Sequence, residues 1–80
     1  MPTIYREQGF RFLFYANEGN EPPHIHVQGK GGDMKIWLPT LVIDSSYGFS
    51  PREQKVILEI TRKNSKAFME KWNEFAAKKG

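Results

Sequence analysis

The chain has no cysteine, and this absence excludes two kinds of structure. Without cysteine among its 80 residues, it forms neither disulfide bonds nor metal centres with thiolate ligands. It also lacks any apolar run approaching the roughly 18 residues that a membrane-spanning helix needs. Residues 1–5 do not show the basic-then-apolar order of a signal peptide. We therefore expect a soluble cytoplasmic protein that does not bind a membrane.

Histidine is also scarce, and its position is the most informative feature of the sequence. The two histidines lie two residues apart in the segment EPPHIHV, residues 21–27. The tandem prolines favour an extended approach to a β-strand. Side chains at i and i+2 of a strand share a face, so His24 and His26 point to one side while Ile25 and Val27 point to the other. We expect any functional site to include this histidine pair.

The net charge of +3 is concentrated in the last third of the chain. Residues 1–50 carry four basic and five acidic side chains, whereas residues 51–80 carry eight basic and four acidic ones. Such a positive region attracts a polyanion or an acidic partner. It is equally typical of a solvated helix face, and we favour this simpler interpretation for the lysines of the region: Lys63, Lys66, Lys71, Lys78 and Lys79.

Alternating apolar residues predict β-strands in the first half of the chain. In residues 10–15 three phenylalanines share one face, and Gly9 marks a turn from a short preceding strand. Residues 17–23 have the composition of a loop, and the glycine-rich segment 29–32 has that of a hairpin turn. The expected strands are residues 3–6, 10–15, 24–28 and 33–38, with a short apolar strand or extended segment at residues 41–43.

The last third of the chain predicts helices. Ser50 can cap a helix, Pro51 suits the first helical position, and Glu53 completes a capping box. Apolar residues then recur at steps of three and four residues to the end of the chain. Asn64 interrupts this pattern. We expect two helices, residues 51–62 and 65–78, or one kinked helix.

Together these elements predict a single α+β domain spanning residues 1–80. Its small antiparallel sheet has three to five strands, and one kinked or two C-terminal helices pack on one face. We define the core face by the apolar side chains expected under the helices: Phe10, Phe12, Phe14, Ile25, Val27, Met34, Ile36 and Leu38. They would pack against Ile57, Ile60, Phe68 and Trp72. We define the polar face by the side chains expected on the other side: Arg11, Leu13, Tyr15, His24, His26, Gln28, Lys35 and Trp37.

Several segments, taken in order, resemble one known bacterial family. They are residues 11–15, 17–18, 21–27, 35–38, 48–50 and 72–75, and the most specific is the Pro-Pro-His-x-His-Val core. Together they strongly resemble the domain-of-unknown-function family 4160 over nearly the whole chain. The resemblance implies a small cytoplasmic protein that is one half of a two-gene cassette similar to a toxin–antitoxin module. A protein partner encoded by the adjacent gene follows from it.

The chain departs from the family at one position. Many relatives have Glu-His-Arg or a similar tripeptide in the last helical region, where this chain has Lys63, Asn64 and Ser65. If that histidine belongs to a metal or catalytic site in relatives, Asn64 puts such a site in doubt here. Asparagine still forms hydrogen bonds, so a structural role at this position is preserved.

Our first functional hypothesis is a binding module that uses the His24/His26 side of the sheet. Tyr15 and Trp37 would anchor a protein or RNA partner. The same side contributes charge and hydrogen-bonding groups through Arg11, Lys35 and Gln28.

The alternative is an RNA-cleaving toxin in which His24 and His26 act as general acid and base, because unperturbed imidazoles titrate near neutrality. Arg11 and Lys35 would then hold the phosphate. Tyr15 or Trp37 would stack on an unpaired base.

A further alternative is a metal-binding protein in which His24 and His26 supply two ligands and a carboxylate supplies the third. The candidate carboxylates are Glu18, Glu21, Asp33 and Asp44. Strands bring two histidines together without any metal, so we predict no cofactor. In the last alternative the histidines are structural, and they hydrogen-bond to the loop at residues 17–22 and fix the entry to the strand.

Overall fold

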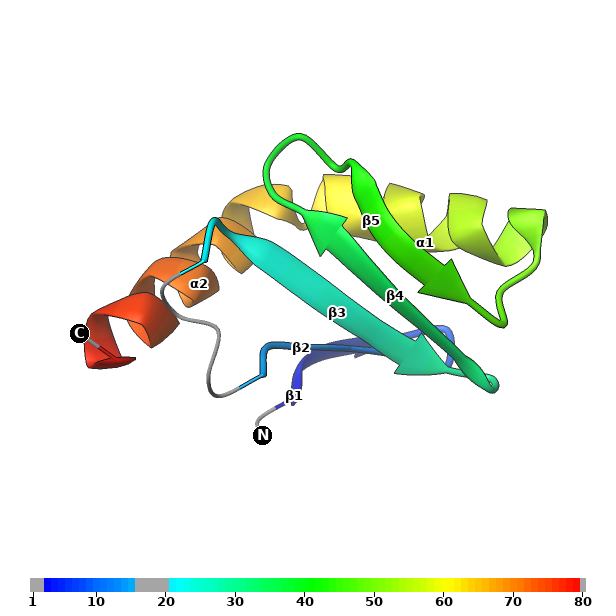
Figure 1. Ribbon diagram of the computed structural model, residues 1–80, viewed down its shortest axis with the longest axis horizontal. Helices are drawn as coiled ribbons and strands as arrows, with labels where there is room; N and C mark the ends of the chain where they lie inside the picture. The colour runs from blue at the N-terminus through cyan, green and yellow to red at the C-terminus, as the bar shows by residue number, and fades with distance from the viewer. Residues whose placement is uncertain (1–2, 16–20, 80) are drawn as a thin grey trace.

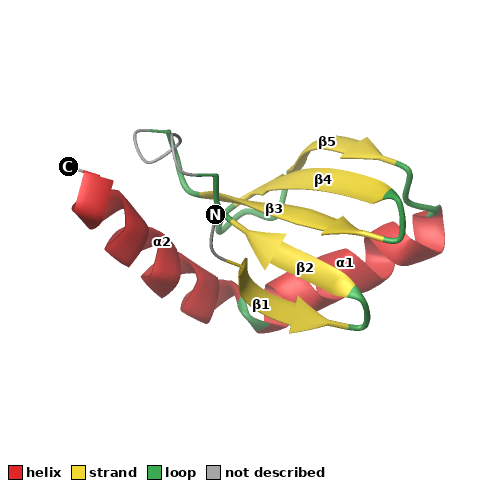
Figure 2. Ribbon diagram, turned by 90° about the horizontal axis from the view of Figure 1, so that it is seen from below, coloured by secondary structure: helices red, strands yellow, loops and turns green. Residues whose placement is uncertain are grey.

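The computed structural model describes residues 3–15 and 21–79. These residues form an antiparallel sheet whose five strands lie in chain order: β1 (Thr3–Glu7), β2 (Phe10–Leu13), β3 (His24–Gly29), β4 (Gly32–Trp37) and β5 (Ile43–Tyr47). Two helices follow, α1 (Pro51–Lys63) and α2 (Ser65–Lys79). Helix α1 crosses behind the sheet, and α2 extends beyond the end of the sheet at which β3 begins (Figures 1 and 2). The predicted α+β fold is confirmed.

The hydrophobic core lies between the sheet and the helices. All twelve side chains that alternation and helical periodicity predict for it are buried in one cluster, joined by Phe49 from the segment before α1. Aromatic rings provide much of the contact between the layers. The ring centroids of Phe12 and Phe68 are 5.5 Å apart, and those of Phe14 and Trp72 are 5.1 Å apart in an edge-to-face arrangement. Such pairs add to the stabilisation that burial provides.

Two tight hairpin turns lie side by side at one end of the sheet. Gln8 and Gly9 join β1 to β2 with φ values of 54° and 85°, and Lys30 and Gly31 join β3 to β4 with φ values of 50° and 82°. Positive φ at both central residues matches the turn that continues the twist of the strands. A Cβ atom at Gly29 would lie 2.4 Å from the carbonyl oxygen of Gly9. Only glycine at position 29 therefore allows the two hairpins to approach this closely.

Of the short strand or extended segment expected at residues 41–43, only Ile43 belongs to a strand. Leu41 has a φ of 66°, and its N–H donates to the carbonyl oxygen of Trp37. This turn, which contains a cis Leu38–Pro39 peptide bond, carries the chain over to β5. The fifth strand therefore begins at Ile43 and runs through polar residues to Tyr47. It lies at the edge of the sheet with a bulge in its pairing to β4, so its sequence lacks the alternation of a half-buried strand.

The helix boundaries follow the predicted capping residues. The side chain of Ser50 accepts from the N–H of Glu53, and the Glu53 carboxylate accepts from the N–H of Ser50, which completes the capping box. Asn64 separates the helices because its side chain donates to the carbonyl oxygen of Ile60 while its own carbonyl accepts from Phe68. The two-helix alternative is therefore confirmed. Neither helix of the part described is long and apolar enough to cross a membrane.

Candidate functional site

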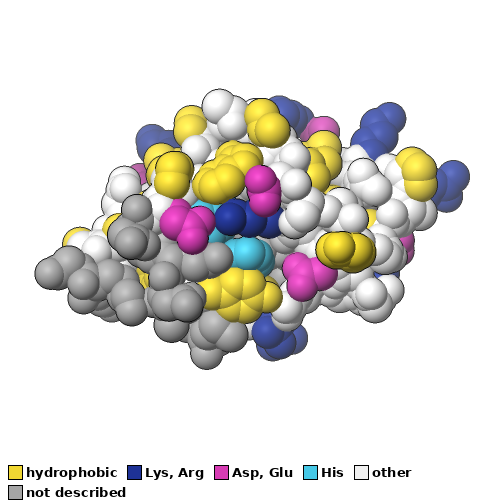
Figure 3. All heavy atoms as spheres, in the orientation of Figure 1, with side chains coloured by type: hydrophobic (Ala, Val, Ile, Leu, Met, Phe, Trp, Pro, Cys, Tyr) yellow, Lys and Arg dark blue, Asp and Glu magenta, His cyan; other side chains and the backbone are white. Residues whose placement is uncertain are grey.

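The strand register arranges the polar face in rows that run across the sheet. In the row nearest the hairpin turns, successive partners on the five strands are Arg6, Arg11, Gln28, Asp33 and Tyr47. The next row contains Leu13, His26, Lys35 and Ser45. In the third row His24 pairs with Trp37. Histidine, basic and acidic side chains gather at the centre of this side, flanked by hydrophobic ones (Figure 3).

His24 is fully buried at the start of β3. Its ring lies between two indoles, with centroid distances of 5.4 Å to Trp37 and 4.8 Å to Trp72 of α2. The Nδ1 atom is 2.9 Å from the carbonyl oxygen of Pro22. Because a carbonyl oxygen only accepts, Nδ1 carries the proton of this hydrogen bond. His24 thus fastens the segment before β3 to the strand, as our structural alternative expects, whereas residues 17–20 of the expected loop lie outside the described residues.

His26 is only 7% exposed because Tyr15 covers it. The ring centroids of Tyr15 and His26 are 4.1 Å apart, and the His24 ring stands almost perpendicular to that of His26 at 5.1 Å. The hydroxyl of Tyr15 accepts from Nε2 of Gln28 at 2.9 Å, and Oε1 of Gln28 accepts from Nη2 of Arg11 at 3.3 Å. A chain of hydrogen bonds therefore holds the phenol ring over the imidazole.

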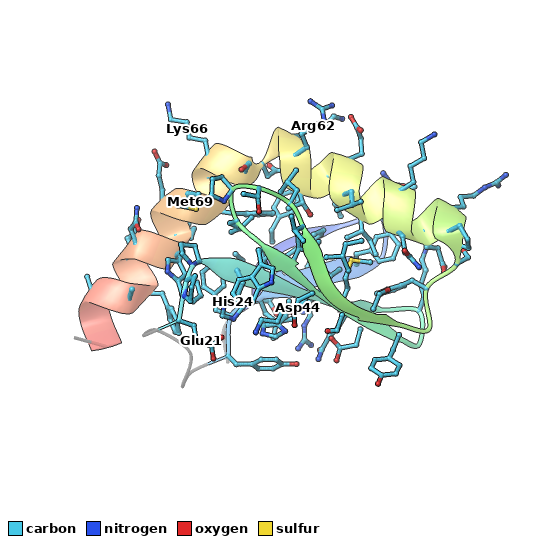
Figure 4. All side chains as sticks on the ribbon, turned by 45° about the horizontal axis from the view of Figure 1, so that its top comes forward. Glu21, His24, Asp44, Arg62, Lys66 and Met69 are labelled. Atoms are coloured by element: carbon cyan, nitrogen blue, oxygen red, sulfur yellow. The ribbon has the colours of Figure 1, made fainter. Side chains whose placement is uncertain are left out.

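The charged and indole groups beside the histidines are also paired. Nζ of Lys35 lies 3.2 Å from Oε1 of Glu21 and 4.5 Å from the centroid of the Trp37 ring. Nε1 of Trp37 donates to Oδ1 of Asp44 at 3.3 Å. Glu21, His24 and Asp44 lie on the same side of the molecule, away from the helical side chains that project on the other side (Figure 4).

All of the site residues predicted from the sequence thus lie on one side of the sheet, but their depth differs from our expectation. The sequence places His24, His26 and Leu13 on the polar face outside the core, and the structure buries all three. Alternation gives the side to which a residue points but not what covers it. Sequence reasoning missed two partners, Trp72 below His24 and Arg6 beside Arg11. Trp72 comes from a helix whose placement depends on the whole fold, whereas Arg6 is brought to Arg11 by the local hairpin register.

The residues do not form a metal centre in the part of the chain that the structure describes. No group of three or more histidine, aspartate and glutamate side chains in residues 3–15 and 21–79 is close enough to hold an ion. Glu18, one of the candidate ligands, lies outside these residues. A structural zinc site needs four ligands and a catalytic one at least three, so two imidazoles are insufficient.

The family model described as "Domain of unknown function (DUF4160)" matches residues 9–73. The chain belongs to this family. No curated protein and no solved structure matches it. The match includes the histidine pair and also Trp72, so the residues that enclose His24 all lie within the DUF4160 domain. The family description assigns no activity to the domain.

Two properties of this DUF4160 domain limit the chemistry of its polar face. The first is the burial of both imidazoles, since a general acid or base must reach the proton that it transfers. The second is the balance of charge on this side of the sheet. Among the residues that the structure describes, three basic side chains accompany three acidic ones: Arg6, Arg11 and Lys35 with Glu21, Asp33 and Asp44.

Proposed function

We propose that this domain is a protein-binding module that holds a partner chain on its polar face. The observation that carries the proposal is the enclosure of His24 and His26 by the rings of Tyr15, Trp37 and Trp72. In this arrangement the histidine rings are packed among aromatic side chains and support the surface, and they do not present reactive nitrogen atoms to solvent. The face consists of half-exposed aromatic side chains surrounded by polar groups, which is the composition of a protein interface.

Trp37 is the anchor of the proposed interface. Its ring is partly exposed, its indole nitrogen is held by Asp44, and Nζ of Lys35 lies over it. These contacts fix the ring before a partner arrives, so little conformational entropy remains to be lost on binding. Tryptophan residues held in this way are frequent hot spots of protein interfaces.

The charge distribution favours a protein over RNA as the partner. An RNA backbone is held by basic side chains that neutralise its phosphates, and this attraction weakens steeply with salt. On the polar face Lys35 is neutralised by Glu21, and Asp33 and Asp44 add two further carboxylates. A protein partner held mainly by Trp37 and Tyr15 does not require unpaired basic side chains on the polar face.

The partner to test first is the protein encoded by the adjacent gene. This choice follows from the resemblance to two-gene cassettes of the toxin–antitoxin type, in which the two cytoplasmic products bind each other. The proposal makes this chain the binding component of such a pair. It does not depend on which of the two products is toxic.

Isothermal titration of the purified chain with the adjacent gene's product tests the proposal. Ser45 is exposed on the same side of the sheet as the polar face, where it is the cross-strand partner of Lys35. Asn73 is exposed on α2. Ser45→Arg should weaken binding at least tenfold because the new side chain projects into the interface, whereas Asn73→Arg should bind as the wild type does. Equal affinities of the two variants, or no binding by the wild type, would contradict the proposal.

A second candidate, RNA cleavage by His24 and His26, has one observation in its favour. The two rings lie 5.1 Å apart, and Lys35 is the cross-strand partner of His26. Full burial of His24 counts against it. Induced expression in bacteria separates the two candidates. Growth arrest with fragmented RNA in the wild type, but not in a folded His24→Ala/His26→Ala variant, would favour cleavage, whereas intact RNA and equal growth would favour binding.

A further inference from the structure

Two arginines face each other at the β1–β2 hairpin, outside the histidine cluster. Arg6 and Arg11 are direct cross-strand partners, one pair away from the turn at Gln8 and Gly9. In a hairpin closed by a two-residue turn, this second pair is of the non-hydrogen-bonded type, whose side chains approach more closely. Like charges placed directly opposite each other destabilise a sheet. A bound anion would convert this repulsion into attraction.

The guanidinium of Arg11 has unused hydrogen-bonding capacity. Its Nε atom is buried and has no hydrogen-bond partner among residues 3–15 and 21–79, although Nη2 donates to Gln28 at 3.3 Å. A buried donor without an acceptor is costly and calls for an explanation such as a ligand. Nε and one Nη form the edge of the guanidinium that binds a carboxylate with two parallel hydrogen bonds.

The surroundings of the pair leave room for such a ligand. Residues 6–11 line an open hollow of about 290 Å³. The acidic residue of the lining, Glu7, already accepts a hydrogen bond from the hydroxyl of Tyr5.

We propose that Arg6 and Arg11 form a carboxylate-binding site that takes an acidic side chain of the protein partner. The proposal deepens the proposed function and rests on it for the source of the carboxylate. The site continues into the polar face, because Gln28 bonds both Arg11 and Tyr15, and Tyr15 covers His26. A partner seated on the polar face can therefore reach the arginine pair, and two like charges placed side by side favour an acidic group.

The test uses an acetylated hexaglutamate amide as the probe, observed in ¹H–¹⁵N spectra that include the arginine Nε–H signals. The peptide should shift the Nε–H of Arg11 and the amides of residues 6–11 in a saturable manner. Arg6→Gln/Arg11→Gln should weaken binding at least tenfold. The control Arg52→Gln/Arg62→Gln removes the same charge from α1 and should stay within twofold of the wild type.

Other outcomes would overturn the carboxylate site. Equal losses in the two double variants would show that only the overall field attracts the peptide. Tighter binding of inorganic phosphate or of a hexanucleotide RNA at the same residues would show that the ligand is a phosphate. If the glutamine variant does not fold, Arg6→Lys/Arg11→Lys keeps the charge without the planar fork and should still bind several-fold more weakly. Wild-type affinity in that variant would overturn the proposal.

Failure of this site is distinguishable from failure of the proposed function. If Ser45→Arg abolishes binding of the adjacent gene's product while Arg6→Gln/Arg11→Gln binds it normally, the polar face stands and the carboxylate site is overturned. If hexaglutamate binds at the arginine pair but Ser45→Arg leaves partner binding unchanged, the arginine site stands and the polar face is excluded as the interface.

Discussion

The two sides of the sheet are buried in different ways. On the core face, phenylalanine and aliphatic side chains are covered by α1 and α2, and their stabilisation follows from the apolar area removed from water. Helix α1 crosses behind the other side of the sheet (Figure 1), yet on the polar face His24 is as inaccessible as Phe12. There the burial results from individual contacts by Tyr15, Trp37 and Trp72. Individual side chains on a polar side of a sheet can therefore be buried as completely as core residues.

The largest expected effect comes from a substitution that disrupts the core face. Phe12 is fully buried between the sheet and Phe68, so Phe12→Ala should lower the free energy of unfolding by about 3–5 kcal/mol. This is a large part of the 5–15 kcal/mol that is typical of whole domains. Urea denaturation followed by circular dichroism measures the change. A loss below about 1 kcal/mol would show that this ring does not belong to a packed core.

A smaller but substantial effect is expected on the polar face. His24→Ala leaves a gap between two indoles and removes the hydrogen bond to Pro22, and we expect a loss of about 2 kcal/mol. Ser45→Ala, at an exposed position of the same side, should change the stability by less than about 0.5 kcal/mol. If both variants are as stable as the wild type, His24 is not part of the framework, and a direct role in chemistry gains support.

The smallest expected effect is a change in the pH dependence of stability. It comes from a hydrogen bond at the edge of the core. The hydrogen bond from Tyr5 to Glu7 raises the pKa of the Tyr5 hydroxyl above its ordinary value of 10.0. A pKa raised in the folded state contributes stability that is complete below the unfolded value and is lost as the pH rises through the folded value. The wild type should therefore lose more stability than Tyr5→Phe as the pH rises above 10.0. Parallel curves for the two proteins in chemical denaturation would contradict this.

The sequence alone predicted the core face almost completely and the polar face only in outline. Alternation in β2, β3 and β4 and periodicity in the helices follow directly from burial on one side, so all twelve predicted core positions are confirmed. The capping box at Ser50 and the break between the helices at Asn64 depend on neighbouring residues only, so the sequence predicted both. By contrast, β5 is a polar edge strand, and it has no periodic signal that marks where it begins.

The depth of the histidines depends on residues that only the tertiary structure brings near. Tyr15 lies beyond the end of β2 and reaches His26 because Gln28 holds its hydroxyl. Trp72 comes from the second helix, whose position follows from the break at Asn64. The side chain of Asn64 bonds the backbone of α1 at the carbonyl oxygen of Ile60. These contacts could not be derived from strand spacing.

The most direct test of the central claim is a ¹H–¹⁵N spectrum of the labelled chain during titration with the unlabelled product of the adjacent gene. The chain's two tryptophans report on different regions, because Trp37 is partly exposed on the polar face and Trp72 is buried in the core. We predict that the indole N–H of Trp37 and the amides of β3, β4 and β5 shift, while exposed amides of α1 and α2 stay in place. Shifts confined to the helices, with the Trp37 signal unchanged, would contradict a polar-face interface.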